Sequence, residues 1–104
     1  MFVGNITSTQ LSNQKLTVEL GNKTVLPCQF DAEAICIWKL NGKDVSIVGR
    51  YHFVDENTEQ GKKDCSIEIE QSIVDDAGLW ECSYLDSSSA SRIFNSIMLI
   101  IMCE

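Results

Sequence analysis

Hydrophobic and polar residues alternate along several short stretches of the chain. The segment KLTVEL (15–20) alternates three apolar residues with polar ones, and CSIEIEQ (65–71) does the same. A period of two is typical of strands that bury one face and expose the other. No segment carries a sustained apolar stripe with the spacing of an α-helix. The pattern therefore predicts an all-β chain.

Turn-forming residues separate these strands at short intervals. The pair Asn41–Gly42 stands between ICIWKL and KDVSIV, which is a strong signal for a two-residue β-hairpin. Many short strands with regular turns favour a β-sandwich or a β-barrel. Further turns are expected at 21–22, 31–34, 48–49, 55–64, 75–78 and 86–91.

Length, charge and hydropathy limit the partners that the chain can have. Its 104 residues, 44% hydrophobic and 22% charged, suit one globular domain over 1–104. The formal charge of −7 repels polyanions, so neither nucleic acid nor an anionic lipid surface is expected as a partner. No apolar run is long enough to span a membrane. The start MFVGNITSTQ lacks the basic and apolar regions of a signal peptide, so either a signal was removed before it or the chain never had one.

The five cysteines favour disulfides over a metal site. They stand at 28, 36, 65, 82 and 103 without a Cys-x-x-Cys pair, and the one histidine is His52. A zinc site uses close pairs of ligands, so neither a metal nor another cofactor is expected. Disulfides indicate an oxidising compartment. The sequons at Asn5 and Asn22 are candidate N-glycosylation sites and agree with it. Cys103 is left over, and a free thiol, an intermolecular link and a partner in residues outside this sequence all stay open for it.

Residues that could carry catalysis are few. Asp75 and Asp76 are adjacent, so they project differently and cannot flank a substrate as a catalytic pair. His52 lies in an expected strand without a nucleophile motif around it. No glycine-rich phosphate loop is present. Catalysis is therefore not expected.

Several motifs together resemble the immunoglobulin superfamily. Cys28, Trp38 and Cys82 stand in the order Cys…Trp…Cys among short alternating strands, and DDAGLWEC (75–82) contains Asp-x-Gly-x-Trp-x-Cys. The resemblance covers about residues 14–102. It implies an immunoglobulin-like sandwich of two antiparallel sheets with Greek-key connections and about seven to nine strands.

The resemblance also implies how the cysteines pair. A Cys28–Cys82 disulfide is expected between the sheets, with Trp38 packed against it. Alternation puts Cys36 on the inward face with Trp38, and puts Cys65 on the apolar face of its own strand. In the immunoglobulin arrangement these two strands belong to opposite sheets, so a second disulfide, Cys36–Cys65, is expected. The alternative is two buried free thiols.

The Asp-x-Gly-x-Trp-x-Cys segment resembles the corner that enters one strand of the family. Gly78 permits a tight turn there, and Asp76 can accept backbone hydrogen bonds or pair with a cation, for which Arg50 is the candidate by analogy. Position 80 is usually tyrosine. Trp80 offers one N–H donor and no hydroxyl, so the corner hydrogen bond is expected to be altered or absent.

The spacing also bears on the type of domain. The 53 residues between Cys28 and Cys82 make a shorter interval than variable-type domains usually have. It resembles the I-set type, with a short strand at about 44–48 and another near RYHFV. The segment VLPCQF is more variable-like, so a V-like domain is the alternative.

Outward positions of the sheet that contains Trp38 and Cys82 are candidates for binding. Alternation makes these Ile37, Lys39, Glu81, Ser83 and Leu85, of which two are apolar where water is the usual neighbour. The segment SIMLIIM (96–102) is apolar on both faces. Cover by another strand, linker or domain is the alternative. With the small polar residues of the loop 86–92, the candidate binding residues are Ile37, Lys39, Ser83, Leu85, Ser87, Ser88, Ser89 and Arg92.

The resemblance implies an extracellular protein-binding module in cell adhesion or cell-surface recognition, without a cofactor. Its partner would be a cell-surface protein, bound homophilically, as in a homodimer, or heterophilically. The chain would belong to the ectodomain of a membrane protein or to a secreted protein, and would not itself span the membrane. Two other classes stay open: a secreted immune-type recognition factor, and a structural spacer such as an intracellular I-set domain.

Overall fold

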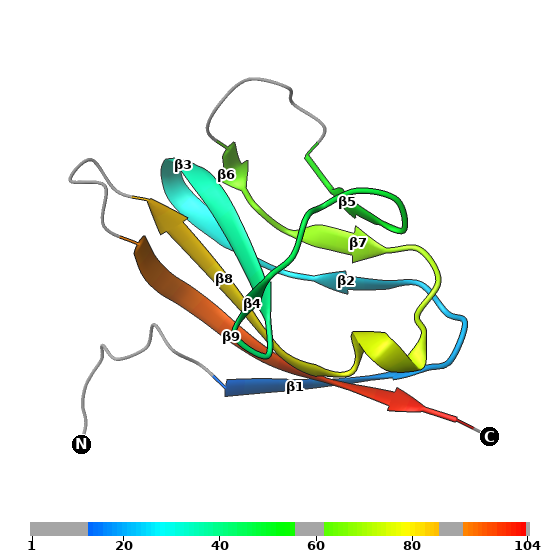
Figure 1. Cartoon of the computed structure of the whole chain (residues 1–104). Helices are drawn as coiled ribbons and strands as arrows, with labels where there is room; N and C mark the ends of the chain where they lie inside the picture. The colour runs from blue at the N-terminus through cyan, green and yellow to red at the C-terminus, as the bar shows by residue number, and fades with distance from the viewer. Residues whose placement is uncertain (1–12, 56–61, 86–90, 104) are drawn as a thin grey trace, which may run out of the picture.

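Two β-sheets packed face to face make up the chain (Figure 1). The structure is a computed structural model that describes residues 13–55, 62–85 and 91–103. The larger sheet has the strand order β1 (Asn13–Glu19), β9 (Ser91–Met102), β8 (Gly78–Leu85), β3 (Gln29–Leu40) and β4 (Lys43–Asp44). The smaller sheet has the order β2 (Thr24–Leu26), β7 (Ile67–Ile69) and β5 (Tyr51–Phe53).

Two further elements complete the fold. Strand β6 (Lys62–Asp64) pairs with the first part of β3, and the 3₁₀ turn η3 (Val74–Asp76) leads into β8. The expected all-β sandwich is confirmed. One strand departs from the antiparallel expectation, because β1 runs parallel to β9. The expected strand at 44–48 is only the two residues of β4, and the strand near RYHFV is β5.

The turn expected at 31–34 was wrong. Strand β3 runs through this segment, and its pairing with β6 shifts register between Gln29 and Ala34. The irregular pairing lets one strand bend from the neighbourhood of β6 toward β8, as Figure 1 shows at the left of the molecule. A bend within a strand replaces the loop because β3 pairs on both sides of it, with β6 at Gln29 and Ala34 and with β8 from Ile35 onward.

The core lies between the sheets at the alternating positions of their strands. Trp38 and Trp80 are at most 2% exposed and pack edge to face, with ring centroids 6.1 Å apart. Inward residues of both sheets complete this layer: Leu26, Ile67, Ile69, Ile97 and Leu99. The segment 96–102 is apolar on both faces because Ile97 and Leu99 point into this core, whereas Met98, Ile100 and Met102 point outward.

Both expected disulfides are present. Cys28–Cys82 spans 54 positions with the two Cα atoms 6.5 Å apart, and Cys36–Cys65 spans 29 positions with a Cα separation of 5.7 Å. The Trp38 indole N–H donates to the carbonyl oxygen of Cys65 at 2.8 Å. The tryptophan therefore fills the core beside both bridges and also satisfies a buried backbone acceptor.

The expected hairpin turn is confirmed, and its asparagine also braces β8. Asn41 (φ 53°) and Gly42 (φ 83°) are both left-handed, as a type I′ hairpin requires. The Asn41 side-chain oxygen accepts the N–H of Leu79 at 2.9 Å. A Cβ on Gly78 (φ 143°) would lie 2.6 Å from the Asn41 amide atoms. Gly78 thus lacks a side chain where the hairpin meets β8.

Asp76 is the buried centre of the corner. Its side chain is 0% exposed, yet its carboxylate accepts bonds from Arg50 Nη1 at 2.8 Å and Arg50 Nη2 at 3.1 Å. The Tyr51 hydroxyl and the N–H of Ile73, the latter at 2.9 Å, also donate to it. Burial alone would raise the pKa of Asp76, but these hydrogen bonds and the Arg50 charge lower it below its ordinary value. The expected Arg50–Asp76 pair is confirmed.

The corner hydrogen bond from position 80 is altered rather than absent. The indole N–H of Trp80 donates to the backbone carbonyl of Asp76 at 2.8 Å. Tyr51, which the sequence did not single out, packs edge to face on Trp80 with ring centroids 5.5 Å apart. A hydroxyl thus reaches the corner from β5, and the indole takes over the contact to the backbone.

Replacing Cys36 and Cys65 by alanine together should lower the free energy of unfolding by about 3–4 kcal/mol, because a 29-residue loop regains entropy in the unfolded chain. Chemical denaturation under non-reducing conditions measures this loss. Cys103→Ala is the matched control, since Cys103 is exposed and free. Equal stability of the double variant and this control would contradict a bridge between the sheets.

Asp76→Asn should destabilise the fold by about 3 kcal/mol at pH 7, because the Arg50 guanidinium loses its buried counter-ion. The folded pKa of Asp76 is lowered, so its contribution is complete above the unfolded pKa of about 4 and is lost as the pH falls through the folded value. Wild type should therefore lose more stability than Asp76→Asn on acidification, measured by urea denaturation at several pH values.

Asp75→Asn is the control for this prediction, because Asp75 is the adjacent residue, has the same chemistry and is exposed. It should change the free energy of unfolding by less than about 0.5 kcal/mol. Equal costs for the two substitutions would mean that the buried carboxylate does not hold the corner.

Candidate functional site

The outer face of the larger sheet carries apolar side chains where β3, β8 and β9 lie side by side. Ile35 on β3 is 48% exposed and Ile93 on β9 is 47% exposed, while Ile37 and Leu85 are half-buried. In the strand register Ile35 lies opposite Leu85, and Ser83 lies between Ile37 and Ile93. These four apolar residues, Ile35, Ile37, Leu85 and Ile93, form what we name the isoleucine face.

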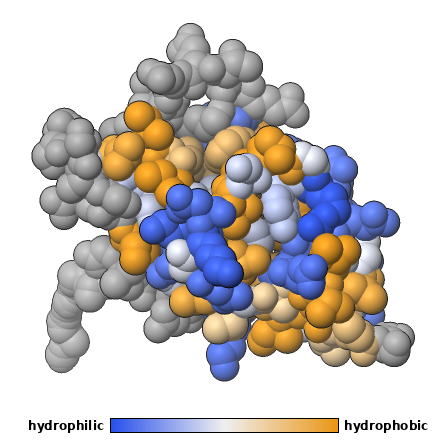
Figure 2. Space-filling model, viewed as in Figure 1, coloured by the Kyte–Doolittle hydropathy of each residue, from blue (hydrophilic) through white to orange (hydrophobic). Residues whose placement is uncertain are grey.

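A polar row separates this face from a second set of apolar residues. Lys39 lies opposite Glu81, and Glu81 lies opposite Ser96. Oppositely charged residues at facing positions attract each other. Beyond the row, the outward residues of β9 are exposed by 39% at Met98, 40% at Ile100 and 51% at Met102. Figure 2 shows hydrophobic residues at the bend of β3 and again near η3, with hydrophilic residues between them.

The sequence analysis placed Ser83 among the outward binding residues, but the structure buries its side chain. Ser83 is on the outward side of β8 by alternation, but only 2% of it is exposed. Its short side chain stands between the two branched side chains of Ile37 and Ile93. Small residues flanked by large ones on a sheet are shielded from solvent, so a partner would contact the isoleucines there.

The other candidate residues divide into four groups. Ile37, Lys39 and Leu85 are half-buried on the outer face, as the alternation predicted. Arg92 lies in β9 opposite Tyr84. Asn22 is exposed in the turn between β1 and β2. Ser87, Ser88, Ser89 and Asn5 lie outside the described residues.

Two of the most exposed residues of the isoleucine face were missed by the sequence analysis. Ile35 is two positions before Ile37, so the same alternation would have found it. Ile93 could not be found in this way. The pairing of β8 with β9 changes from Cys82–Asn95 to Ser83–Ile93, which leaves Phe94 as an extra residue.

The bulge also redirects an aromatic side chain. Phe94 packs edge to face on Phe30, with ring centroids 4.5 Å apart, and Phe30 is 5.1 Å from the ring of Tyr84. The extra residue thus supplies the core with an aromatic side chain. It also shifts the alternation by one position, so that Ile93 faces outward. Without the bulge, alternation counted back from the buried Ile97 would point Ile93 inward.

The outer face of the smaller sheet differs in chemistry. His52 Nε2 lies 3.3 Å from Glu70 Oε2 and 3.6 Å from Glu68 Oε2, and Lys23 Nζ lies 3.3 Å from Glu68 Oε2. These partly exposed groups form a solvated network of charges, worth little to stability. Val25 is exposed by 43% beside them. The two faces therefore offer a partner opposite surfaces, one apolar and one charged.

The described residues also limit the chemistry that this surface can carry. Among them, no group of three or more histidine, cysteine, aspartate or glutamate side chains is arranged to hold a metal ion. Within the same part of the chain, no helix has the length and hydropathy to cross a membrane.

Known proteins resemble this chain in fold rather than in sequence. No protein-family model matches it, and no curated protein matches it. Among solved structures, titin domain M7 is 22% identical, with a TM-score of 0.67 over 86% of each chain. The D1 domain of Duf (Kirre) is 19% identical, with a TM-score of 0.71 over 88% of this chain and 92% of that one.

A third solved structure is the extracellular portion of mouse CD200RLa. It is 13% identical, with a TM-score of 0.64, and the match covers 88% of this chain and 57% of that one. The strand order, the inter-sheet disulfide beside a buried tryptophan and the corner at Asp76 all agree with this likeness. The chain is an immunoglobulin-like domain by fold.

Proposed function

We propose that this chain is an extracellular protein-binding module that acts in cell adhesion or cell-surface recognition and carries no catalysis. The observation that carries the proposal is the isoleucine face. Ile35 on β3 and Ile93 on β9 are about half exposed on the two strands that flank β8, with Ile37 and Leu85 beside them. A contiguous apolar surface of this kind is typical of protein interfaces.

The contrast between the two sheets supports the choice of face. The smaller sheet presents His52, Glu68 and Glu70 to water, and burying those charges against a partner would cost desolvation energy. Burying the isoleucine face releases water from apolar surface, and the Lys39–Glu81 row beside it can fix the orientation of a partner. Binding through the larger sheet is therefore favoured.

The two disulfides support the extracellular location. Structural disulfides persist in oxidising compartments and are rare in the cytosol. The bridges Cys28–Cys82 and Cys36–Cys65 both cross the core of a chain of 104 residues, as small secreted domains often require. The likeness to the extracellular portion of mouse CD200RLa agrees with this location.

A structural spacer within a larger protein is the second candidate. The likeness to titin domain M7 is the observation that favours it. A spacer does not need to bind a separate partner through the isoleucine face. It also does not require oxidised cysteines when it lies inside the cell, so the thiol state of the protein isolated from its own cells separates the two functions.

Ile35→Glu and Ile93→Glu should each weaken binding by about tenfold or more, because a carboxylate would have to be desolvated in an apolar interface. Sedimentation velocity measures self-association, and binding of the labelled, multimerised domain to cells measures recognition of another protein. Melting temperatures should change little, since both side chains are about half exposed.

Val25→Glu is the matched control, because Val25 has a similar exposure of 43% but lies on the smaller sheet. It should bind as wild type does. The isoleucine face is not a binding surface if wild type shows neither self-association nor cell binding. The same holds if Ile35→Glu and Ile93→Glu bind as well as Val25→Glu does. Either result favours the spacer.

A further inference from the structure

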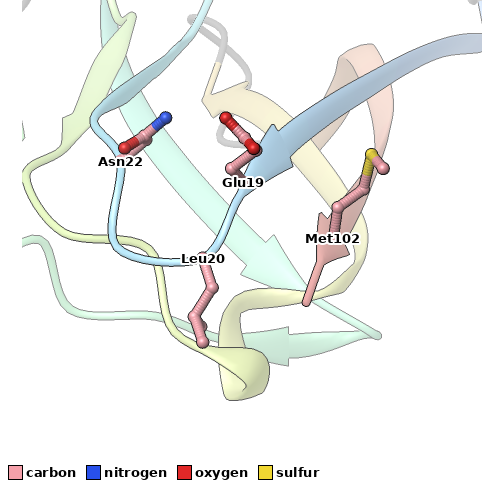
Figure 3. Close-up of a pocket in the computed structure, with 4 residues that line it drawn as sticks. All are labelled: Glu19, Leu20, Asn22 and Met102. Atoms are coloured by element: carbon pink, nitrogen blue, oxygen red, sulfur yellow. The ribbon is translucent and has the colours of Figure 1, made fainter. Parts of the chain in front are cut away.

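One end of the sandwich gathers apolar side chains from three separate segments. Leu20 follows β1, Val74 belongs to η3, and Met102 ends β9; they are 48%, 59% and 51% exposed. The N–H of Leu20 donates to the carbonyl oxygen of Met102 at 2.9 Å, and the N–H of Gly21 donates to that of Ser72 at 2.8 Å. These bonds hold the three segments together at what we name the apolar end. Met102 points to the outer side of the larger sheet, as its partner Glu19 does, whereas Leu20 points the other way (Figure 3).

Asn22 stands at the edge of this apolar end with its backbone fixed. Its N–H donates to the carbonyl oxygen of Glu19 at 3.0 Å, which closes a turn with Gly21 at φ 90°. Its own carbonyl oxygen accepts the N–H and the hydroxyl of Ser72, at 3.0 and 2.8 Å. The residue itself is exposed.

The Asn22 side chain borders an open hollow of about 360 Å³ that is also lined by Glu19, Leu20 and Met102 (Figure 3). Asn22-Lys23-Thr24 is an acceptor sequence for N-linked glycans. An exposed asparagine on a rigid turn can carry a bulky group without disturbing the fold. The hollow provides room for the first sugar beside the amide nitrogen.

We propose that Asn22 carries an N-linked glycan whose first sugars lie over Met102 and cover the outer side of the apolar end. N-acetylglucosamine has apolar C–H faces and an acetyl methyl group, so it can cover apolar side chains while its hydroxyls remain in water. The glycan would thus keep an exposed apolar surface from associating with other proteins. This inference rests on the extracellular location proposed above.

The position of the glycan leaves the isoleucine face accessible. Met102 and Ile93 are nine residues apart on the same strand, which corresponds to about 30 Å along β9. The glycan and the proposed partner would therefore occupy opposite ends of the larger sheet. Such an arrangement gives the domain one surface closed to proteins and one open to them.

The test uses the full chain with a cleavable secretory leader, expressed in eukaryotic cells that add N-glycans, in an Asn5→Gln background so that Asn22 is in its only sequon. Peptide mass spectrometry should find the Asn22 peptide glycosylated in this protein and in Thr24→Ser, which keeps the sequon. Asn22→Gln and Thr24→Ala, which destroy it, should lack the glycan. An unmodified Asn22 peptide in the secreted protein would overturn the proposal.

Methionine oxidation tests where the sugars lie. Oxidation follows exposure, so Met102 should oxidise about twofold more slowly in the glycosylated protein than in Asn22→Gln. Met98, 39% exposed and four residues earlier on β9, is the internal control and should oxidise at the same rate in both. Equal rates at Met102 would overturn the placement of the first sugars over Met102.

The outcome is independent of the test of the binding face. Asn22→Gln should retain any binding that Ile35→Glu and Ile93→Glu lose. A secreted protein that binds cells but is unmodified at Asn22 would contradict the glycan proposal alone. A glycosylated protein whose Ile35→Glu and Ile93→Glu variants bind as wild type does would contradict the proposed binding face alone.

Discussion

The distance between the two sheets is fixed where two disulfides cross the core beside Trp38. Cys36 and Trp38 are inward residues of one strand, and Cys82 lies opposite Trp38 on the next. The N–H of Cys65 also donates to the carbonyl oxygen of Cys28 at 2.7 Å, so the ends of the two bridges on the other side are joined as well. A rigid centre of this kind makes the outer face of the larger sheet a defined surface.

A second constraint lies at the corner below this centre, where a carboxylate is buried without contact to water. Asp76 is tolerated there because three residues donate hydrogen bonds to its carboxylate: Arg50, Tyr51 from β5 and, through its backbone N–H, Ile73. Trp80 then binds the backbone of the same residue. The corner joins the turn before β8 to the start of β5, and so it holds the smaller sheet against the larger one.

The sequence was sufficient for the features that depend on local pattern and failed for those that depend on pairing. Alternation alone separated the inward Trp38 and Cys36 from the outward Ile37, and it selected the Cys36–Cys65 pair once the strands were assigned to sheets. The bend through 31–34, the parallel pairing of β1 and the bulge at Phe94 arise from contacts between distant segments. No local pattern records them, so Ile93 and the role of Tyr51 stayed hidden.

The two-residue length of β4 has a consequence for how copies of this chain can meet. An exposed sheet edge can accept another strand and extend the sheet into a neighbouring molecule, as in β-augmentation. Here Lys43 and Asp44 offer too little backbone for that, and β5, at the edge of the smaller sheet, has only three residues. At the far edge of the larger sheet, β1 alternates outward Lys15 and Glu19 with its inward residues, and charges at an edge discourage strand addition. The short and charged edges therefore protect the domain from polymerising strand by strand, and they leave the flat sides of the sheets for contacts that stop at one partner.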